Sequence, residues 1–460
     1  MTTEYKPQRD TSDYQAGDAA HHIHAFLDQK ALNAEGPRVI VGGERLHLWD
    51  NDGNRYLDGM SGLWCTNLGY GRKDLAAAAT RQLEQLPYYN MFFHTTHPAV
   101  VELSELLFSL LPKHYSHAIY TNSGSEANEV LIRTVRRYWQ ILGKPQKKIM
   151  IGRWNGYHGS TLGATALGGM KFMHDMGGVI PDVAHIDEPY WFAHEGDLTP
   201  AQFGLRAAQQ LESKILELGA ENVAAFVAEP FQGAGGMIFP PESYWPEIQR
   251  ICRKYDVLLC ADEVIGGFGR TGEWFAHQHF DFEPDTLSIA KGLTSGYIPM
   301  GGLILSRRMA QVLVEQGGVF AHGLTYSGHP VAAAVAIANL TALRDEGVVA
   351  QVKNDTGPYL QNCLREVFGN HPLVAEIQGT GLVAALQFAQ DKATRKRFDN
   401  EGDIAWRCRT IGFEEGVIIR STLGRMIMAP ALIATRGEID ELVSKTKIAV
   451  DRTAQEIGVL

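Results

Sequence analysis

Short apolar runs alternate with segments of helical periodicity through the middle of the chain. The apolar runs "AIYTN", "KKIMIG", "VAAFVAEP" and "VLLCADEVI" are typical of short buried strands. Between and around them, apolar residues recur at helical spacing in "THPAVVELSELLFSLL", "SEANEVLIRTVRRYWQIL" and "SYWPEIQRICRKY". Strands that alternate with helices predict an α/β fold, in which helices cover a mostly parallel central sheet.

The two ends of the chain have a different pattern. Residues 39–58 alternate like a β-hairpin around the turn "DNDG". After about residue 330 an Ala-rich helix is followed by "GTGLVAALQF" and "GVIIRSTLGRMIMAPAL", which resemble strands, and then by a final helix. We therefore predict a large domain over residues 76–330. A smaller α+β domain is built from residues 1–75 and 331–460.

Length and composition narrow the class of protein. A chain of 460 residues is too long to fold around a single hydrophobic core, so two or more domains are expected. A net charge of -10 argues against binding to nucleic acid or to an anionic membrane. The five cysteines are scattered, which indicates a reducing compartment rather than disulfides or zinc. The N-terminus lacks the apolar core of a secretory signal, and no apolar stretch is long enough to span a bilayer. We expect a cytoplasmic protein.

Lys291 raises the first chemical question, because it ends the apolar run in "DTLSIAKGLTSG". Burying an ammonium group is costly unless it is paired or loses its proton. The side chain either reaches out to solvent or stays nearly neutral, so that its amine can attack a carbonyl group.

A possible phosphate site follows the strand in "YTNSGSEANEV". Ser123, Gly124 and Ser125 stand where a helix begins, and backbone N–H groups and hydroxyls there suit a phosphate. Ordinary helix capping explains the same residues equally well.

A pair of carboxylates, Asp262 and Glu263, ends the strand "VLLCADEVI". At the carboxyl end of a parallel strand they face the usual ligand crevice, and a buried aspartate suits a protonated pyridine nitrogen. The following glycines (Gly267, Gly269 and Gly272) match a dinucleotide fingerprint, but no obvious helix follows them, so we reject that interpretation.

Two further loops carry candidate ligand contacts. Tyr157 and His158 follow a strand in "RWNGYHGS", where an aromatic ring could stack on a planar ligand. Thr325 and Ser327 lie in the glycine-bounded turn "HGLTYSGHP", a second phosphate or turn site. Loop packing is the alternative in both places.

The clustered histidines do not predict a metal site. "HHIH" (His21, His22 and His24) and "HQH" (His277 and His279) show no carboxylate partner or recognisable ligand set, so we interpret them as surface or packing residues. The anchors of serine hydrolases and P-loop NTPases are also absent from the sequence.

Taken together, the segments resemble the class III, pyridoxal-phosphate-dependent aminotransferases of fold type I. The resemblance runs from about His21 to the C-terminus and is carried by "YTNSGSEAN", "RWNGYHGST", "AEPFQGAGG", "ADEVIGGFGRTG", "IAKGLTSGYIPMGG" and "HGLTYSGHP". "GLWCTNLGYGRKDL" and "PYYNMFFHTTHP" are similar to the ω-amine:pyruvate group, which includes putrescine–pyruvate and β-alanine–pyruvate enzymes.

The resemblance implies a role for each motif residue. Lys291 matches the lysine that carries pyridoxal phosphate, and Asp262 matches the partner of its ring nitrogen. Tyr157 matches the stacking aromatic residue, and Glu229 matches a carboxylate near the ring. The other implied cofactor contacts are Ser123, Gly124, Ser125, His158 and Val264, with Gln232 near the phenolic oxygen. Thr325 matches a phosphate ligand donated by a second subunit, which implies a homodimer with shared sites.

The resemblance also implies a substrate pocket. Arg420 matches an arginine that binds the carboxylate of a keto acid and swings aside for an amine, although Arg425 is close enough in sequence to be the alternative. Phe26, Trp64 and Phe92 match aromatic residues that line the pocket. Core packing is the other interpretation of these aromatic residues.

The expected activity is transfer of an amino group from a primary amine or ω-amino acid to pyruvate. The alternatives are a 4-aminobutyrate or ornithine type of transaminase that uses 2-oxoglutarate, and an aminomutase or decarboxylase of the same fold. Gly266, Leu324 and "STLGRM" depart from the subgroup pattern, which affects substrate preference rather than the chemistry. The amine donor, stereopreference and choice between dimer and tetramer stay open.

Overall fold

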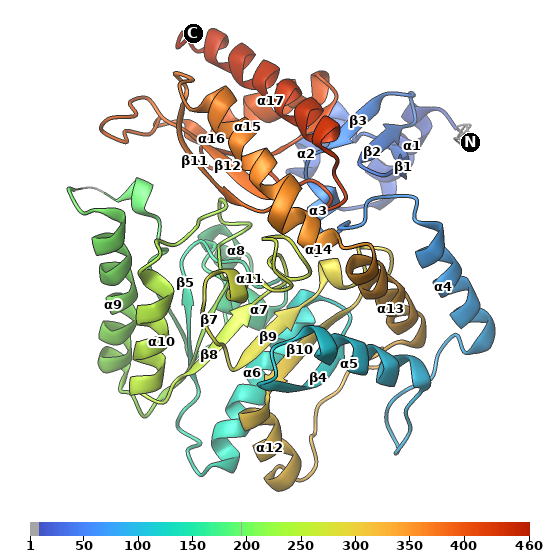
Figure 1. Cartoon of the computed structure of the whole chain (residues 1–460), viewed down its shortest axis with the longest axis vertical. Coiled ribbons are helices and arrows are strands. Elements are labelled where there is room, and N and C mark those ends of the chain that lie inside the picture. Colours follow the sequence, from blue (N-terminus) through green and yellow to red (C-terminus); the bar gives the residue numbers. More distant parts are fainter. Residues whose placement is uncertain (1–8, 195) are drawn as a thin grey trace.

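The central element of the computed structural model is a seven-stranded sheet with the strand order β4-β10-β9-β8-β7-β5-β6 (Figure 1). The structure describes residues 9–194 and 196–460. The sheet consists of β4 (Tyr115–Thr121), β5 (Ile149–Arg153), β6 (Val183–Ile186), β7 (Val223–Ala228), β8 (Leu258–Asp262), β9 (Thr286–Ile289) and β10 (Gly301–Ser306).

Only β10 opposes the direction of the other strands in this sheet. It pairs antiparallel with both β4 and β9. The pairs β5–β6, β5–β7, β7–β8 and β8–β9 are all parallel. The prediction of a mostly parallel sheet is therefore confirmed. Because β4 runs in the same direction as β9, the carboxyl ends of six strands lie at one edge of the sheet.

Helices cover both faces of this sheet: α5, α9, α10 and α13 pack on one face, and α6 and α12 pack on the other (Figure 1). Their bounds are α4 (Lys73–Gln85), α5 (Pro98–Leu110), α6 (Gly124–Ile141), α7 (Leu162–Leu167), α8 (Lys171–Asp175), α9 (Pro200–Leu218), α10 (Tyr244–Lys254), α11 (Ala276–His279), α12 (Arg307–Gln316) and α13 (Pro330–Asp345), with the short helices η1 (Trp191–Ala193) and η2 (Lys291–Leu293). The helix predicted after residue 330 is α13, and it packs against α4 and α5.

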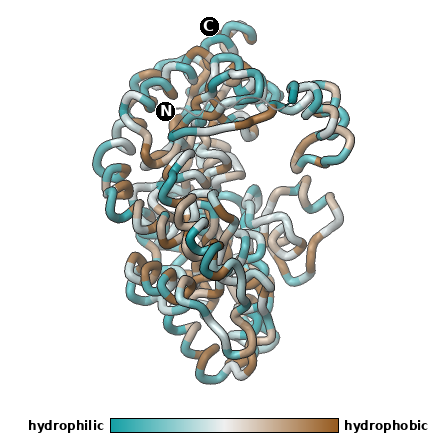
Figure 2. Tube along the Cα trace, turned by 90° about the vertical axis from the view of Figure 1, so that its right-hand side faces the viewer, coloured by the Kyte–Doolittle hydropathy of each residue, from teal (hydrophilic) through white to brown (hydrophobic). Residues whose placement is uncertain are grey.

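Sequence signals explain how these helices begin and which side they bury. Ser123 caps α6 by accepting a hydrogen bond from the Glu126 N–H group, and Thr199 forms a capping box with Gln202 before α9. In α6, Val130, Leu131, Val135 and Trp139 are buried. Figure 2 shows hydrophilic and hydrophobic turns mixed along the outer helices, as expected for helices that cover a core with one face.

The smaller part of the molecule joins segments from both ends of the chain (Figure 1). It contains α1 (Thr11–His21), α2 (Gln29–Glu35), β1 (Ile40–Glu44), β2 (His47–Asp50), β3 (Arg55–Asp58), α3 (Ser61–Trp64), α14 (Val348–Gln351), η3 (Val352–Thr356), α15 (Gly357–Phe368), β11 (Val374–Thr380), β12 (Val383–Phe388), α16 (Glu401–Glu414), β13 (Val417–Ile418), β14 (Arg420–Thr422), β15 (Arg425–Met428) and α17 (Arg436–Glu456). β13 pairs parallel with β3, so the two ends share a sheet. The domain boundaries themselves stay a prediction.

The hairpin predicted over residues 39–58 is a three-stranded antiparallel unit. The predicted turn "DNDG" joins β2 to β3. A second turn at Arg45 joins β1 to β2. Arg45 adopts a left-handed φ of 52°. This turn carries no Asn-Gly or Asp-Gly signal in the sequence. The sequence pattern therefore predicts a single hairpin and does not distinguish β1 from β2.

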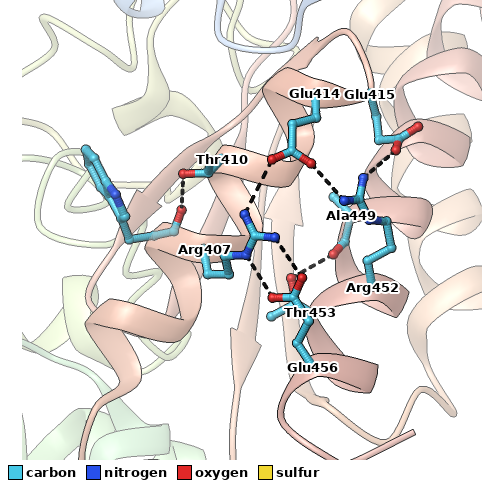
Figure 3. Close-up of polar contacts among 9 residues, drawn as sticks. Arg407, Thr410, Glu414, Glu415, Ala449, Arg452, Thr453 and Glu456 are labelled. Atoms are coloured by element: carbon cyan, nitrogen blue, oxygen red, sulfur yellow. Dashed lines mark hydrogen bonds and ion pairs between the residues drawn. The ribbon is translucent and has the colours of Figure 1, made fainter. Parts of the chain in front are cut away.

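Ion pairs connect α16 to α17 on the surface (Figure 3). Arg407 binds Glu456 at 2.7 Å, and Arg452 binds Glu414 at 2.8 Å and Glu415 at 2.7 Å. Exposed pairs of this kind are screened by water and contribute little to stability. Among the described residues, no helix has the length and apolar composition needed to cross a membrane.

Candidate active site

A cavity of about 280 Å³ opens at the edge of the large sheet where the parallel strands end. Each of five strands contributes a side chain or turn directly after its last residue. The lining residues are Asn122, Ser123, Gly124 and Ser125 after β4; Tyr157, His158 and Gly159 after β5; Glu229 after β7; Asp262, Val264 and Ile265 at the end of β8; and Ala290, Lys291, Thr294, Gly296, Ile298, Pro299 and Met300 after β9. Parallel pairing therefore gathers segments more than 150 residues apart in sequence.

The start of α6 forms an anion-binding corner of this cavity. The N–H groups of Gly124 and Ser125 lie in the first turn, where no carbonyl of the same helix can accept them. A Cβ atom added to Gly124 would lie 2.9 Å from Val264, so the close packing requires glycine here. Ser125 Oγ accepts a hydrogen bond from the Ser160 N–H group at 3.1 Å. These donors and the helix dipole suit a phosphate group.

The carboxylate of Asp262 is buried and is held in place by hydrogen-bonding neighbours. Its side chain is 4% exposed. Oδ2 contacts His158 Nδ1 and accepts a hydrogen bond from Asn128 Nδ2, both at 2.8 Å. Oδ1 accepts a hydrogen bond from the Val264 N–H group at 3.0 Å. These contacts fix the carboxylate at the cavity wall, where it can stabilise a cation.

Lys291 enters the cavity from a strained turn. Its backbone has a left-handed φ of 46°, two residues after the end of β9. Among the described residues its ammonium makes no hydrogen bond, and Nζ lies 5.4 Å from the centre of the Trp64 ring. Burial lowers the pKa of Lys291, while Asp262 and Glu229 act in the opposite direction. The neutral amine needed for attack on a carbonyl is therefore favoured.

Tyr157 is positioned by Glu229 beneath it. Glu229 Oε1 accepts a hydrogen bond from the Tyr157 N–H group at 3.1 Å, and Oε2 accepts one from Gly233 at 2.7 Å. Burial raises the pKa of Glu229. The Tyr157 hydroxyl lies 3.1 Å from Ser160 Oγ. The aromatic ring is thereby held at the cavity wall.

Three of the predicted substrate residues lie close to this cavity without lining it. Trp64 is buried, and its ring faces Lys291 and Arg420; the Arg420 Cζ atom lies 4.6 Å from the ring centre. Phe26 meets the Tyr157 ring edge-on at 6.4 Å. Burial lowers the pKa of Arg420.

Arg425 lies in a different environment from Arg420. It is buried beside Tyr190, and its guanidinium donates a hydrogen bond to Gln378 at 3.0 Å. Its nearest carboxylate is that of Glu376, at 3.7 Å. The geometry therefore places Arg420, and not Arg425, against the Trp64 ring that also faces Lys291.

Phe92 and Thr325 lie together outside the cavity of this chain. A Cβ atom added to Gly323, two residues before Thr325, would lie 2.9 Å from the Phe92 ring. The carbonyl of Thr325 accepts a hydrogen bond from the Tyr88 hydroxyl at 2.8 Å. Both Phe92 and Thr325 are exposed. Ser327 has a turn role, since its hydroxyl accepts a hydrogen bond from Leu324.

One expectation about the crevice is wrong. Glu263 turns away from the cavity and binds the N–H groups of Ala276 and His277 together with His277 Nδ1. Successive strand residues point to opposite faces, which separates Glu263 from Asp262. The expectation for Gln232 stays a prediction: its side chain is buried and donates a hydrogen bond to the Trp154 carbonyl at 2.9 Å.

The view that the histidine clusters lack carboxylate partners is also wrong. His277 pairs with Glu263, as described above. His22 and His24 both pair with Asp18, at 3.0 and 2.7 Å. Asp18 lies one helical turn before His22, and the i, i+4 spacing along α1 is the signal that could have identified it.

Asn128 is a site residue that the sequence analysis missed. It donates to Asp262 Oδ2 and to the His158 carbonyl at 2.7 Å, and accepts a hydrogen bond from Ser288. It is a polar residue on the buried face of α6, and that position among apolar neighbours was the available signal.

The residues of the cavity fit pyridoxal phosphate. The start of α6 suits the phosphate, Asp262 suits a protonated ring nitrogen, and Tyr157 suits the ring face. Lys291 supplies an amine for the aldehyde. The glycine at position 124 leaves room that a side chain would fill.

Comparison with known proteins gives the same assignment along almost the whole chain. Residues 32–450 match the family described as Aminotransferase class-III. The chain is 52% identical over 448 residues to the putrescine–pyruvate aminotransferase of Pseudomonas aeruginosa, covering 97% of this chain and 98% of that protein. It is 41% identical to a diaminobutyrate–2-oxoglutarate transaminase of Halomonas elongata, covering 95% and 94%. The ω-transaminase of Pseudomonas jessenii in complex with PMP matches with a TM-score of 0.94 and 36% identity, covering 96% and 99%.

Proposed function

Because this chain belongs to the class-III aminotransferases, we propose that it moves an amino group from a primary amine or ω-amino acid to pyruvate, with pyridoxal phosphate held in the cavity. The products are an aldehyde or ketone and alanine. One observation carries the proposal: Lys291, with its pKa lowered by burial, enters the same cavity as the buried carboxylate of Asp262. A reactive amine and a fixed anion are the two groups that this cofactor requires.

When bound, pyridoxal phosphate supplies an aldehyde that takes up the amino group and a cationic ring that withdraws electrons. Asp262 holds positive charge at the ring nitrogen, and His158 and Asn128 hold Asp262 in place. Lys291 Nζ, once free, takes a proton from the substrate carbon that bears the nitrogen. The aromatic side chain of Tyr157 orients the cofactor ring, because Glu229 fixes the backbone of Tyr157.

Two substrates of different charge must use the same pocket. Pyruvate carries a carboxylate, whereas a simple amine donor does not. Arg420 binds that carboxylate, and its guanidinium rests on the face of Trp64 when no carboxylate is present. The lowered pKa of Arg420 reflects a partly desolvated cation, for which an anionic partner is favourable.

The amine:pyruvate assignment is supported by the similarity to the putrescine–pyruvate aminotransferase. The second candidate is a transaminase that uses 2-oxoglutarate. The relative from Halomonas elongata bears that acceptor in its name, at lower identity. An aminomutase or decarboxylase of the same fold is the third candidate.

The active form in this proposal is a homodimer with shared sites. Phe92 and Thr325 belong to an exposed apolar patch that one chain leaves uncovered. The exposed aromatic residues of the patch are Tyr88 with Tyr326, and Phe92 with Phe93, whose rings contact one another in these pairs. Patches of this kind mark interfaces. A second subunit covers the patch and brings Thr325 to the phosphate of its partner.

Near-visible absorbance of the purified protein tests the proposal. The cofactor band should bleach with putrescine, β-alanine or benzylamine, and return with pyruvate as alanine forms. The Lys291→Ala variant should bind the cofactor but not turn over. Recovery with 2-oxoglutarate and not with pyruvate would favour the second candidate. Consumption of the amine without alanine formation would favour the third, and the absence of a band with added cofactor would refute the assignment.

A further inference from the structure

We propose that Asp18, His22 and His24 form a binding site for a divalent cation of the zinc type, outside the cavity and independent of the proposed reaction. Asp18 and His22 lie at the end of α1, and His24 lies in the loop that follows. One ligand atom from each side chain lies within 4.8 Å of the other two. Within the described part of the chain, no other group of His, Cys, Asp and Glu meets this criterion.

The three side chains already lie against one another. Asp18 Oδ1 lies 3.0 Å from His22 Nδ1, and Asp18 Oδ2 lies 2.7 Å from His24 Nε2. The two imidazole rings are 4.3 Å apart at their centres. Ligands at about 2.0–2.2 Å from a tetrahedral zinc ion are separated by somewhat more than 3 Å, so small side-chain rotations create the site.

The electrostatics of the cluster suit a cation. Among the described residues, Asp18 forms no ion pair with lysine or arginine. The cluster also lies at the carboxyl end of the eleven-residue helix α1, where the helix dipole is negative.

The ligand set selects the kind of metal. Two imidazole nitrogens and one carboxylate suit Zn²⁺, Co²⁺, Ni²⁺ or Cu²⁺, whereas Mg²⁺ and Ca²⁺ prefer oxygen ligands. Three protein ligands leave a fourth position for water. The His22 side chain is 62% exposed, and those of His24 and Asp18 are 24% and 20% exposed, so an ion reaches the site from solvent.

Occupancy restrains the segment that carries Phe26. His24 lies two residues before Phe26, and its N–H group donates to Gln29 at the start of α2. Phe26 contacts Tyr157 and Phe172 through ring edges. A metal ion joins the end of α1 to this loop, so it limits local opening next to the cavity.

Calorimetric titration of the cofactor-loaded, chelator-treated protein with Zn²⁺ tests the site. We expect one tight equivalent per chain and no comparable signal with Mg²⁺. Asp18→Asn and His22→Gln should each weaken binding by at least about tenfold. His21→Gln is the matched control, since His21 is the adjacent exposed histidine and lies outside the cluster; it should bind Zn²⁺ as the wild type does.

Several outcomes would overturn the proposal. They are the absence of a stoichiometric site, unchanged affinity in both cluster variants, or an equal loss in His21→Gln. Absorbance of bound Co²⁺ gives an independent readout, because a site of low coordination number gives intense visible bands that six-coordinate aqueous Co²⁺ lacks. Unchanged melting temperature and cofactor absorbance of the metal-free variants exclude misfolding as the cause.

Hydrogen exchange tests the restraint separately. With Zn²⁺ bound, amide exchange across residues 22–28 should slow in the wild-type protein and stay unchanged in Asp18→Asn. Binding of Zn²⁺ without this protection would refute the restraint of the segment that carries Phe26.

Discussion

Lys291 and Lys147 are two lysines removed from bulk water, and their surroundings differ at the ammonium group. Lys147 Nζ donates to the carbonyls of Ala220 and Tyr255, at 3.1 and 3.4 Å. Among the described residues, Lys291 Nζ has no such acceptor and faces a cavity. Burial lowers the pKa of both groups. Only Lys291 is therefore free to use its neutral form in chemistry.

The lowered pKa of Lys291 predicts a pH dependence for capture of the cofactor. The ammonium is unreactive, so the rate should rise as the pH passes the lowered pKa and level off below the ordinary value of 10.5. Stopped-flow absorbance after pyridoxal phosphate is added to cofactor-free protein measures this rate. A rate that keeps rising through pH 10.5, as for an exposed lysine, would contradict the prediction.

Arg420 and Arg425 should separate binding from stability when they are replaced. Arg420→Ala removes a charge-assisted bond, so the KM for pyruvate should rise by about tenfold or more, with little change for an amine that lacks a carboxylate. Steady-state kinetics with each substrate varied measure this. Equal weakening of both half-reactions would contradict the role of Arg420.

Arg425→Met is the matched comparison. It leaves the Glu376 carboxylate without its nearest cation, and breaking a buried pair costs about 3 kcal/mol. The melting temperature should fall by several degrees, while the ratio of the KM values for pyruvate and amine stays the same. A selective loss of pyruvate binding in this variant would exchange the roles of the two arginines.

At the scale of elements, the site depends on strand direction and on the start of one helix. The carboxyl ends of β4, β5, β7, β8 and β9 meet at one edge because these strands run the same way. β10 runs in the opposite direction and brings Met300, just before its first residue, to the same edge. The ligand is thus surrounded by loops of a rigid sheet.

Gly124→Ala should weaken cofactor binding through this helix start. The added methyl group would lie 2.9 Å from Val264. It would displace the first turn of α6, which forms the anion-binding corner of the cavity. We expect about tenfold lower affinity for pyridoxal phosphate, measured by absorbance titration. Gly17→Ala in α1 is the control, since nothing lies within 4 Å of its new Cβ atom.

The double variant Gly124→Ala with Val264→Ala tests the cause. If the clash displaces the helix, shortening Val264 should recover part of the affinity. Losses that simply add would show that the methyl group acts in another way.

At the scale of the whole molecule, the exposed aromatic patch is the feature that one chain leaves unexplained. Phe93 is 86% exposed, and Tyr326 is 56% exposed. Apolar groups of this size are seldom left in water together on a monomer. Coverage by the second copy proposed above would also account for the placement of Thr325 outside the cavity of its own chain.

Mixed dimers of two inactive variants test the shared site. Lys291→Ala lacks the amine, and Thr325→Asp places a negative charge against the phosphate. In a mixed dimer, one site has both defects and the other has neither, so each mixed dimer should regain about half of the wild-type activity. Random pairing at equal amounts makes half of the dimers mixed, so the refolded mixture should regain about a quarter. Size-exclusion chromatography with activity assays of the refolded mixture measures this, and activity no greater than the sum of the parents would contradict shared sites.

The sequence predicted the elements whose signals are local. Buried strands, capped helices and glycine-bounded loops all leave patterns within about 20 residues, so β5, β7, β8, α6 and α10 agree with the prediction. The direction of the sheet followed from strands that alternate with helices. The motif residues Lys291, Asp262 and Tyr157 were also identified from the sequence, and the fold brings all three to one cavity.

Only the tertiary structure decided which of these residues face one another. Asp262 and Glu263 are neighbours in sequence, yet alternation along the strand puts one at the cavity and the other against α11. Arg420 and Arg425 are equally basic, and packing alone separates them. The sequence by itself determined the kind of chemistry, because reactive groups are residue types. The fold determined the site, because burial and direction depend on contacts between distant segments.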